Sequence, residues 1–215
     1  MDYEVARARM VKEQLIRHGI TDEHVLRAMS IVPRHYFIDQ GFWPRAYGDY
    51  PLPIGNNQTI SQPYIVALMC QELALPGTGE KVLEVGTGSG YQTAVLAIMG
   101  QRVYTIERHQ GLFDNAQRIL NGLGVTGVTF RVGDGTLGWE EEAPFEGIVV
   151  TAGAPDIPDG LVDQLAVGGR LVIPVGDRDN QRLIVVEKGE KIIEKRDAGG
   201  CLFVPLVGER GWEGE

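Results

Sequence analysis

Long apolar runs and a surplus of basic residues are both missing from this sequence of 215 residues. Apolar runs such as Ala94–Met99 fall far short of the roughly 18 residues that a membrane span requires. Acidic groups outnumber basic ones by 29 to 20, and the resulting net charge of -9 opposes binding to a polyanion. We therefore expect neither a membrane nor a nucleic acid as a partner.

Cysteine and histidine are also scarce. Two cysteines, Cys70 and Cys201, are too few for a disulfide framework, and neither has a cysteine or histidine at metal-ligand spacing. The four histidines are scattered along the chain, so we expect no metal site. The N-terminus lacks the basic start and apolar stretch of a secretory signal, which predicts a cytoplasmic protein.

The first third of the chain predicts helices and one long loop. Apolar residues recur at helical spacing from Ala8 to Leu15 and again from Val25 to Val32, after a capping Thr21-Asp22 pair. Pro63 suits the first turn of a helix that runs to about Leu73. Between these helices, Tyr36–Gln62 is rich in proline, glycine and aromatic residues and reads as a long ordered loop. Such loops are uncommon unless they bind something, so we expect substrate contacts there.

From residue 81 onward, short apolar runs without alternation predict strands buried on both faces, which is typical of a parallel sheet wound with helices. The strands are expected at Val82–Val85, Val103–Ile106, Val128–Val132, Ile148–Thr151 and Leu171–Val175, and the helices at Tyr91–Met99, Leu112–Leu120 and Gly160–Leu165. Three later runs predict antiparallel strands at the end of the sheet, with a hairpin tip at Lys188-Gly189-Glu190: Arg182–Glu187, Lys191–Arg196 and Cys201–Leu206.

A glycine-rich loop, Gly86-Thr-Gly-Ser-Gly90, joins the first predicted strand to a helix. Its glycines allow positive φ and the close approach of a ligand, and the helix start beside them presents unpaired N–H groups. The third glycine comes one residue too early for the G-x-G-x-x-G fingerprint of dinucleotide-binding proteins. Glu84, just before the loop, disfavours a phosphate but suits an ammonium group. S-adenosylmethionine carries both an adenosine and such an ammonium.

Two further acids follow neighbouring predicted strands. Glu107 lies near the distance from the loop at which an acid accepts hydrogen bonds from ribose hydroxyls, and Asp134-Gly135 ends the next strand, where a carboxylate can accept the adenine amino group. Ligands of open wound sheets bind at this edge. Each feature alone has a structural alternative, a tight turn or a solvated strand end. Together and in this order they favour cofactor binding.

The stretch Leu52–Tyr64, LPIGNNQTISQPY, resembles the protein-L-isoaspartate (D-aspartate) O-methyltransferases. The family typically has a glycine where this chain has Asn57. The resemblance implies a Rossmann-like methyltransferase fold in one domain over 1–215, with an N-terminal region (1–78), a cofactor-binding core (79–180) and C-terminal strands (181–215). It extends through Val32-Pro33-Arg34, 82–93, 133–135 with Trp139, 143–145, 168–176 and 203–206.

The resemblance implies methyl transfer from S-adenosylmethionine to the free α-carboxyl of an L-isoaspartyl residue in a damaged protein or peptide. It makes Ser61 the catalytic residue and places Ile60 and Val204 beside it against the substrate, in a chain expected to act as a monomer. Cofactor contacts are expected from two residues beside Ser61, from the glycine loop and from the acids around it: Thr59, Gln62, Glu84, Gly86, Thr87, Gly88, Ser89, Gly90, Glu107, Asp134 and Gly135.

This chemistry needs little activation. A carboxyl that titrates near 4 is roughly a thousandfold more ionised than protonated at pH 7, so no general base is required. We therefore assign Ser61 an orienting role and not that of a nucleophile, although a serine before Gln62-Pro63 is also a good helix cap. Three other functions stay open on the residues alone: a methyltransferase for RNA or a metabolite, an NAD-dependent dehydrogenase, and a non-catalytic nucleotide-binding module.

Overall fold

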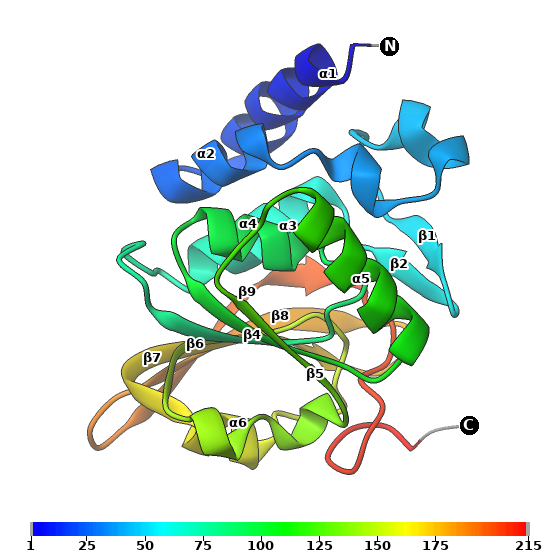
Figure 1. The fold of residues 1–215 in the computed structure, drawn as a ribbon. Coiled ribbons are helices and arrows are strands. Elements are labelled where there is room, and N and C mark those ends of the chain that lie inside the picture. Colours follow the sequence, from blue (N-terminus) through cyan, green and yellow to red (C-terminus); the bar gives the residue numbers. More distant parts are fainter. Residues whose placement is uncertain (1, 214–215) are drawn as a thin grey trace.

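The computed structural model describes residues 2–213, and its central element is a seven-stranded sheet (Figure 1). The first five strands in the spatial order pair in parallel and the last two are antiparallel. This arrangement confirms the predicted mostly parallel, wound sheet with antiparallel C-terminal strands. The spatial order is β5 (Val128–Val132), β4 (Arg102–Glu107), β3 (Lys81–Val85), β6 (Phe145–Val150), β7 (Leu165–Gly176), β8 (Gln181–Lys188) and β9 (Ile193–Cys201).

Helices cover the two faces of the sheet unequally. On one face lie α3 (Pro63–Glu72), α4 (Tyr91–Ile98) and α5 (Gln110–Gly122), and Figure 1 shows α1 (Tyr3–Met10) and α2 (Glu23–Ile31) stacked beyond them. The other face carries the short α6 (Asp159–Asp163). The central strands β3 and β6 are buried almost throughout, whereas β5 at the sheet edge is largely exposed. Burial on both faces is thus confirmed for the central strands only.

The helices expected in the N-terminal region are present, but the first begins at Tyr3, earlier than the apolar repeat that starts at Ala8. Asp22 caps α2, because its Oδ1 accepts the Val25 N–H at 3.0 Å. Gly19, at φ 93°, closes the preceding helical segment in the left-handed conformation. That segment is longer than α1, because a π-helical turn (Val11–Leu15) and a 3₁₀ turn (Ile16–His18) continue it. Pro63 is the first residue of α3, as expected.

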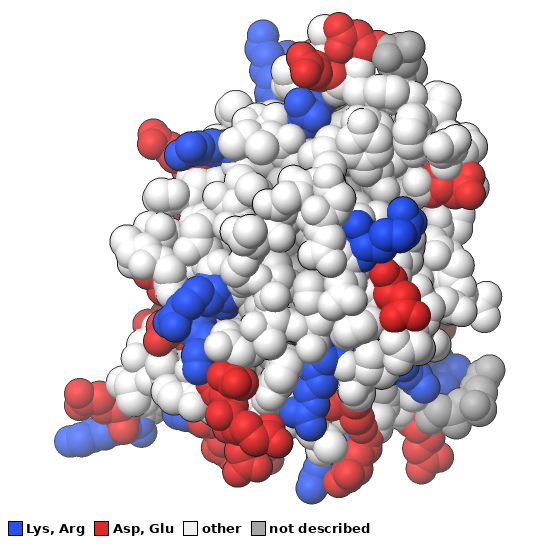
Figure 2. Space-filling view, viewed as in Figure 1, with Lys and Arg blue, Asp and Glu red and all other residues white. Residues whose placement is uncertain are grey.

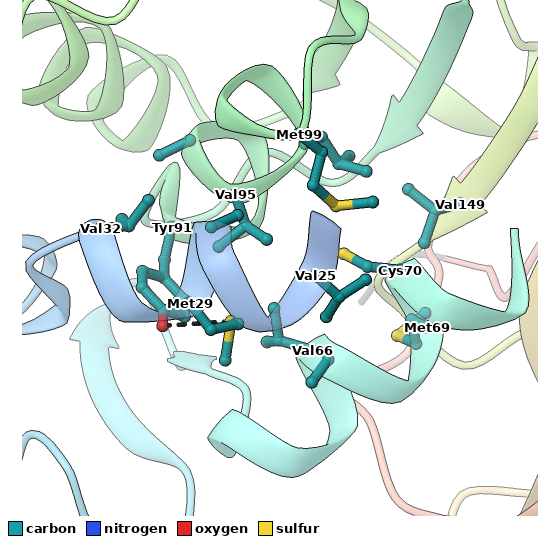
Figure 3. Close-up of a cluster of buried hydrophobic side chains, with 14 of the residues drawn as sticks. Val25, Met29, Val32, Val66, Met69, Cys70, Tyr91, Val95, Met99 and Val149 are labelled. Atoms are coloured by element: carbon teal, nitrogen blue, oxygen red, sulfur yellow. Dashed lines mark hydrogen bonds between the residues drawn. The ribbon is translucent and has the colours of Figure 1, made fainter. Parts of the chain in front are cut away.

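A core rich in sulfur joins these helices to the sheet. Figure 3 shows Met29 of α2 beside Tyr91, and Cys70 of α3 close to Met99 after α4; these side chains and Met69 of α3 are all buried. The Tyr91 hydroxyl donates to the Met29 sulfur at 3.5 Å. Thioether side chains are flexible and fill irregular gaps, which suits the contact among these three helices. The Cys70 thiol packs in this core as a small hydrophobic group.

The expectation of a loop over Tyr36–Gln62 is wrong in its second half. After two 3₁₀-helices, η3 (Arg34–Phe37) and η4 (Gln40–Arg45), the chain forms an antiparallel hairpin of β1 (Leu52–Gly55) and β2 (Gln58–Ile60). The turn residues Asn56 and Asn57 have φ of 50° and 54°. A two-residue hairpin turn needs positive φ at both positions, and asparagine tolerates it better than most residues. Asn57 therefore supports the turn in place of the glycine usual in the family.

Three boundaries in the C-terminal half also differ from expectation. The expected strand Cys201–Leu206 does not form, because β9 ends at Cys201 and the chain then makes only isolated bridges, Gly153 with Pro205 and Val207 with Trp212. β9 starts later and runs further than the expected Lys191–Arg196, so its hairpin closes at Gly189 and Ile192. Leu165 begins β7 and does not belong to α6.

Replacing Gly90 by alanine will destabilise the fold. Gly90 has φ 85°, and a Cβ there would lie 3.1 Å from the Ala116 Cβ on α5. Left-handed strain and overpacking together are expected to lower the free energy of unfolding by about 2–4 kcal/mol. Gly111→Ala is the control, because a Cβ at this helical position meets nothing within 4 Å. Urea denaturation measures both, and equal unfolding midpoints would contradict the packing role of Gly90.

Candidate active site

A cleft opens at the C-terminal ends of β3, β4 and β6, where ligands of wound sheets bind. Four segments that are far apart in sequence form its walls. They are the end of the hairpin with the residue after it (Gln58–Ser61), the glycine loop with the start of α4 (Glu84–Ser89, Tyr91 and Gln92), the end of β4 (Ile106–His109), and the segment Val204–Val207, with Val66, Gly135, Thr151 and Ala152 between them.

The glycine loop is fixed by backbone hydrogen bonds to the neighbouring strand. The N–H groups of Gly86 and Thr87 both donate to the Ile106 carbonyl, at 2.8 and 3.2 Å. Thr151, at the end of β6, donates through its hydroxyl to the Gly86 carbonyl at 2.6 Å. A Cβ on Gly86 would lie 2.4 Å from that hydroxyl oxygen, so only glycine fits. The loop is therefore held in place from both sides without any ligand.

Glu84 is a fully buried carboxylate with one unpaired oxygen. The hydroxyls of Thr93 and Thr105 donate to its Oε2 at 2.5 and 2.7 Å, and Oε1 has no partner among the described residues. Burial raises the pKa of Glu84 to about 7, although the two threonine hydrogen bonds oppose this shift. A buried acceptor without a partner is costly, and here it lies in the wall of a cleft. It is suited to a cationic donor, as the sequence indicates.

Glu107 links the glycine loop to α5. Its Oε2 accepts the Gly88 N–H at 2.8 Å and its Oε1 accepts the His109 N–H at 2.9 Å. Each carboxylate oxygen can accept more than one hydrogen bond, so Glu107 keeps acceptor capacity toward the cleft. This is the geometry that a ligand with hydroxyl donors needs.

Asp134 lies just outside the cleft lining, whereas Gly135 is part of it. The Thr136 N–H and hydroxyl donate to its Oδ1, and the Glu209 N–H donates to its Oδ2. Burial opposes ionisation of Asp134, but these hydrogen bonds and the nearby Arg108 outweigh it and keep its pKa below the ordinary value. The carboxylate thus fastens the C-terminal segment beside the cleft, and its contact with an adenine stays a prediction.

Ser61 follows β2 and lines the cleft together with Thr59 and Ile60. It does not cap α3, because the N-cap residue is Gln62 and no side chain caps this helix. The Ser61 hydroxyl makes no hydrogen bond to any other residue in the described part of the chain, so it is free to donate to a ligand. Gln62 lies outside the cleft lining.

The segment around Val204 is held in place by the Gln181 side chain, which hydrogen-bonds to its backbone as a neighbouring strand would. The Gln181 side chain accepts the Phe203 N–H at 2.7 Å and donates to the Phe203 carbonyl at 3.1 Å. On the next residue, the Val204 carbonyl accepts the Gly153 N–H at 2.8 Å. These bonds hold the segment extended although it is outside the sheet. They also explain why the expected strand over these residues is absent.

Several residues near the cleft escape sequence reasoning. Arg108 and His109 follow Glu107, and Thr151 follows the last residue of β6, so the rule that strand ends line the site could have found them. Arg34 had no such signal. Its guanidinium is fully buried 4.9 Å above the Tyr91 ring and donates to the Ala46 carbonyl, and its two terminal nitrogens have no partner among the described residues. Burial lowers its pKa to about 10.

Comparison with known proteins agrees with this geometry. The family model for protein-L-isoaspartate(D-aspartate) O-methyltransferase matches residues 6–211. The chain belongs to this family. It is 56% identical over 216 residues to the protein-L-isoaspartate O-methyltransferase of Syntrophotalea carbinolica, covering 100% of this chain and 99% of that one. Within residues 2–213, no group of three or more His, Cys, Asp and Glu residues could hold a metal ion.

Two solved structures share the fold closely. A protein-L-isoaspartate O-methyltransferase superposes with a TM-score of 0.84 at 27% identity, covering 95% of this chain and 67% of that one. A second, from Plasmodium falciparum, is described as a putative enzyme of the same kind in complex with S-adenosyl-L-homocysteine. It gives a TM-score of 0.81 at 28% identity over 94% of this chain and 98% of that one. The Rossmann-like methyltransferase fold expected from the sequence is thereby confirmed, and family membership makes the chain an S-adenosylmethionine-dependent methyltransferase.

Glu84→Gln will change how stability depends on pH. The pKa of Glu84 is about 7 in the folded chain against 4.5 ordinarily, so between these values the folded chain binds the proton more tightly than the unfolded chain. The free energy of unfolding of the wild type, minus that of the variant, should therefore fall as pH rises from about 5 to 7. Urea denaturation across this range measures the difference.

Glu190→Gln is the control for this experiment, because Glu190 is exposed in the β8–β9 turn. The wild-type minus Glu190→Gln difference should stay nearly constant over the same range. A Glu84 difference that is flat or rises with pH would show that the buried carboxyl is not protonated in the folded chain.

Proposed function

We propose that this protein transfers a methyl group from S-adenosylmethionine to the free α-carboxyl of L-isoaspartyl residues in damaged proteins and peptides. The observation that carries the proposal is the unpaired Oε1 of Glu84, buried in the wall of a cleft that Ser61 also lines. One region of the cleft thus offers an anionic acceptor and another offers a neutral donor. Membership of the family supplies the substrate class.

The residues present suit S-adenosylmethionine. Glu84 would hold the ammonium of its methionine part, because the ammonium would donate a hydrogen bond to Oε1, which otherwise has no partner. Glu107 would accept hydrogen bonds from the ribose hydroxyls, and Asp134-Gly135 would lie at the adenine. Remaining cofactor contacts are assigned to the glycine loop and the hairpin: Gly86, Thr87, Gly88, Ser89, Gly90, Thr59 and Gln62.

When bound, S-adenosylmethionine supplies a methyl group on a positively charged sulfur. The substrate carboxylate oxygen attacks the methyl carbon, the carbon–sulfur bond breaks, and its electron pair stays on sulfur in S-adenosylhomocysteine. The carboxylate is already ionised at pH 7, so the chain needs only to align the reacting atoms and to exclude water. The backbone amide nitrogen of the next residue then attacks the ester carbonyl and methanol leaves, and hydrolysis of the resulting succinimide partly restores aspartate.

Ser61 orients the attacking carboxylate. A neutral hydroxyl suits this task better than a cation, because a cationic partner would stabilise the charged ground state more than the transition state, in which the charges neutralise. Arg108, the cation in the cleft wall, is near enough to Asp134 to lower its pKa, which assigns it to the adenosine end. The substrate backbone would lie along Ile60 and Val204, as an added strand does on a sheet edge.

We further propose that the chain acts as a cytoplasmic monomer without nucleic-acid or membrane partners. The net charge of -9 disfavours a polyanion. Over residues 2–213, no helix is long and apolar enough to cross a membrane. Sedimentation of the purified protein tests the oligomeric state directly.

The purified protein should transfer labelled methyl from S-adenosylmethionine to an isoaspartyl peptide and not to the same peptide with ordinary aspartate. The two peptides differ only in which carboxyl continues the chain, so alignment in the cleft decides between them. Scintillation counting of the recovered peptides measures the transfer. Equal labelling of the two, or no labelling of either, would overturn the proposed function.

Ser61→Ala should lower kcat about tenfold and change the dissociation constant of S-adenosylhomocysteine less than twofold, because one orienting hydrogen bond is lost. Asp134→Ala should do the reverse, since it acts at the adenosine end. Steady-state kinetics and calorimetry measure the two quantities. Ser30→Ala, at an exposed residue of α2, is the control. Equal losses of both quantities in both site variants would contradict the assigned roles.

A further inference from the structure

A second and larger hollow also borders the hairpin. Its volume is about 930 Å³, against about 150 Å³ for the cleft. β1 contributes to this hollow and β2 contributes to the cleft, so the hairpin stands between the two. We call it the aromatic groove and define it by its lining residues: Tyr36, Phe37, Ile38, Asp39, Gln40, Phe42, Trp43, Pro53, Ile54, Gly55, Asn115, Arg118, Ile119, Gly122 and Leu123.

Aromatic rings from η3 and η4 form one wall of the aromatic groove. Tyr36 is 48% exposed, more than any other aromatic residue described, and Trp43 packs edge-on against it at 5.7 Å between ring centres. α5 forms the facing wall with Ile119 and Leu123. Large rings held in place by their neighbours give much contact area at little entropic cost. The groove is therefore suited to apolar side chains.

Charge at the aromatic groove is balanced and sparse. Its lining holds one acid, Asp39, and one base, Arg118. Figure 2 shows that the centre of the face viewed is largely uncharged, with charged side chains around its upper, side and lower edges. Nothing here selects a polyanion, so the groove favours a neutral, apolar polypeptide segment over a nucleic acid.

The aromatic groove is in contact with the active site through one side chain. Ile54 lines the groove, and its Cδ1 lies 3.6 Å from where a Cβ on Gly88 would stand. Gly88 lines the cleft and its N–H is held by Glu107. Ile54 of β1 therefore lies between the aromatic groove and the glycine loop.

We infer that the aromatic groove binds apolar side chains of the substrate polypeptide, several residues away from the isoaspartyl residue in the cleft. This inference rests on the proposed function. A polypeptide substrate continues beyond its reacting residue, and the aromatic groove, which meets the glycine loop at Ile54, is near enough to receive that continuation. A hollow of several hundred Å³ takes a ligand of a few residues. Contact with rings and aliphatic side chains is tolerant of sequence, which suits an enzyme whose substrates share only a damaged residue.

The test compares three peptides with the same isoaspartyl core. One has no extension, one carries six added residues rich in leucine and phenylalanine, and one carries six serines and glycines; each extension is placed on either side of the core. Six extended residues span about 20 Å, which is enough to pass the hairpin. For the wild type, we expect the KM of the apolar peptide to be about tenfold below that of the serine–glycine peptide on one side, with equal kcat.

Two variants alter the lining of the aromatic groove and leave the residues that line the cleft unchanged. Gly122→Glu places a charged side chain in it, and a Cβ at Gly122 meets nothing within 4 Å, so α5 tolerates the change. Tyr36→Ser removes the exposed ring. In both, the KM ratio should fall to about one while the unextended peptide keeps its wild-type kcat and KM. Gly160→Glu adds the same charge to α6, also with nothing within 4 Å, and should behave as the wild type.

The inference is overturned if the wild-type ratio is near one on both sides, or if Gly122→Glu and Tyr36→Ser leave the ratio unchanged. It is also overturned if sedimentation shows a wild-type dimer that Gly122→Glu dissociates, because the groove would then hold a second copy of the chain. Failure to methylate even the unextended peptide would instead contradict the proposed function, so the two failures are distinct.

Discussion

The carboxylate of Glu107, at the end of β4, is hydrogen-bonded both to the glycine loop and to the start of α5. It binds the Gly88 N–H of the loop that follows β3 and the His109 N–H at the start of α5. The Ile106 carbonyl next to it accepts from Gly86 and Thr87. Because these bonds form within the chain, the loop holds its ligand-binding shape before a ligand arrives. Binding then avoids most of the ordering cost that a mobile loop would carry. The cleft walls from the hairpin and from Val204 are arranged around this fixed point.

Two ionisable side chains near this loop are buried with polar atoms that have no hydrogen-bond partner among the described residues. Glu84 lies beneath it with an unpaired oxygen, and Arg34 lies against Tyr91 with two unpaired nitrogens. Each costs folding free energy, because a buried ionisable group loses its hydration and keeps polar atoms without a hydrogen-bond partner. Strongly shifted pKa values tend to cluster at functional sites. Glu84 can regain a partner from a ligand in the cleft. Arg34 instead joins the segment at Ala46 to the start of α4, so it supports the relative position of the hairpin and the glycine loop.

Sequence reasoning succeeded where local pattern decides structure. Unbroken apolar runs predicted the central parallel strands, and the glycine loop with Glu84 predicted the kind of pocket. It failed where contacts between distant residues decide. The hairpin has strands of three and four residues, too short for a pattern, and its turn depends on Asn57 adopting positive φ. The segment after Cys201 has a strand-like sequence, but the Gln181 side chain takes the backbone groups that another strand would bind. The strand-end rule places Thr151 near the site, but no local pattern predicts its hydrogen bond to the Gly86 carbonyl.

The two hollows beside the hairpin contribute to catalysis in different ways. Alignment in the cleft matters most in the transition state and therefore raises kcat. Apolar contacts several residues away are the same before and during methyl transfer, so they can lower KM but leave kcat unchanged. Lower KM increases the rate whenever substrate is present below KM. An enzyme that must find one altered residue among many sequences gains from a groove that accepts apolar side chains of many kinds, and rings such as Trp43 provide it without a charge or hydrogen-bond pattern that would restrict the substrates further.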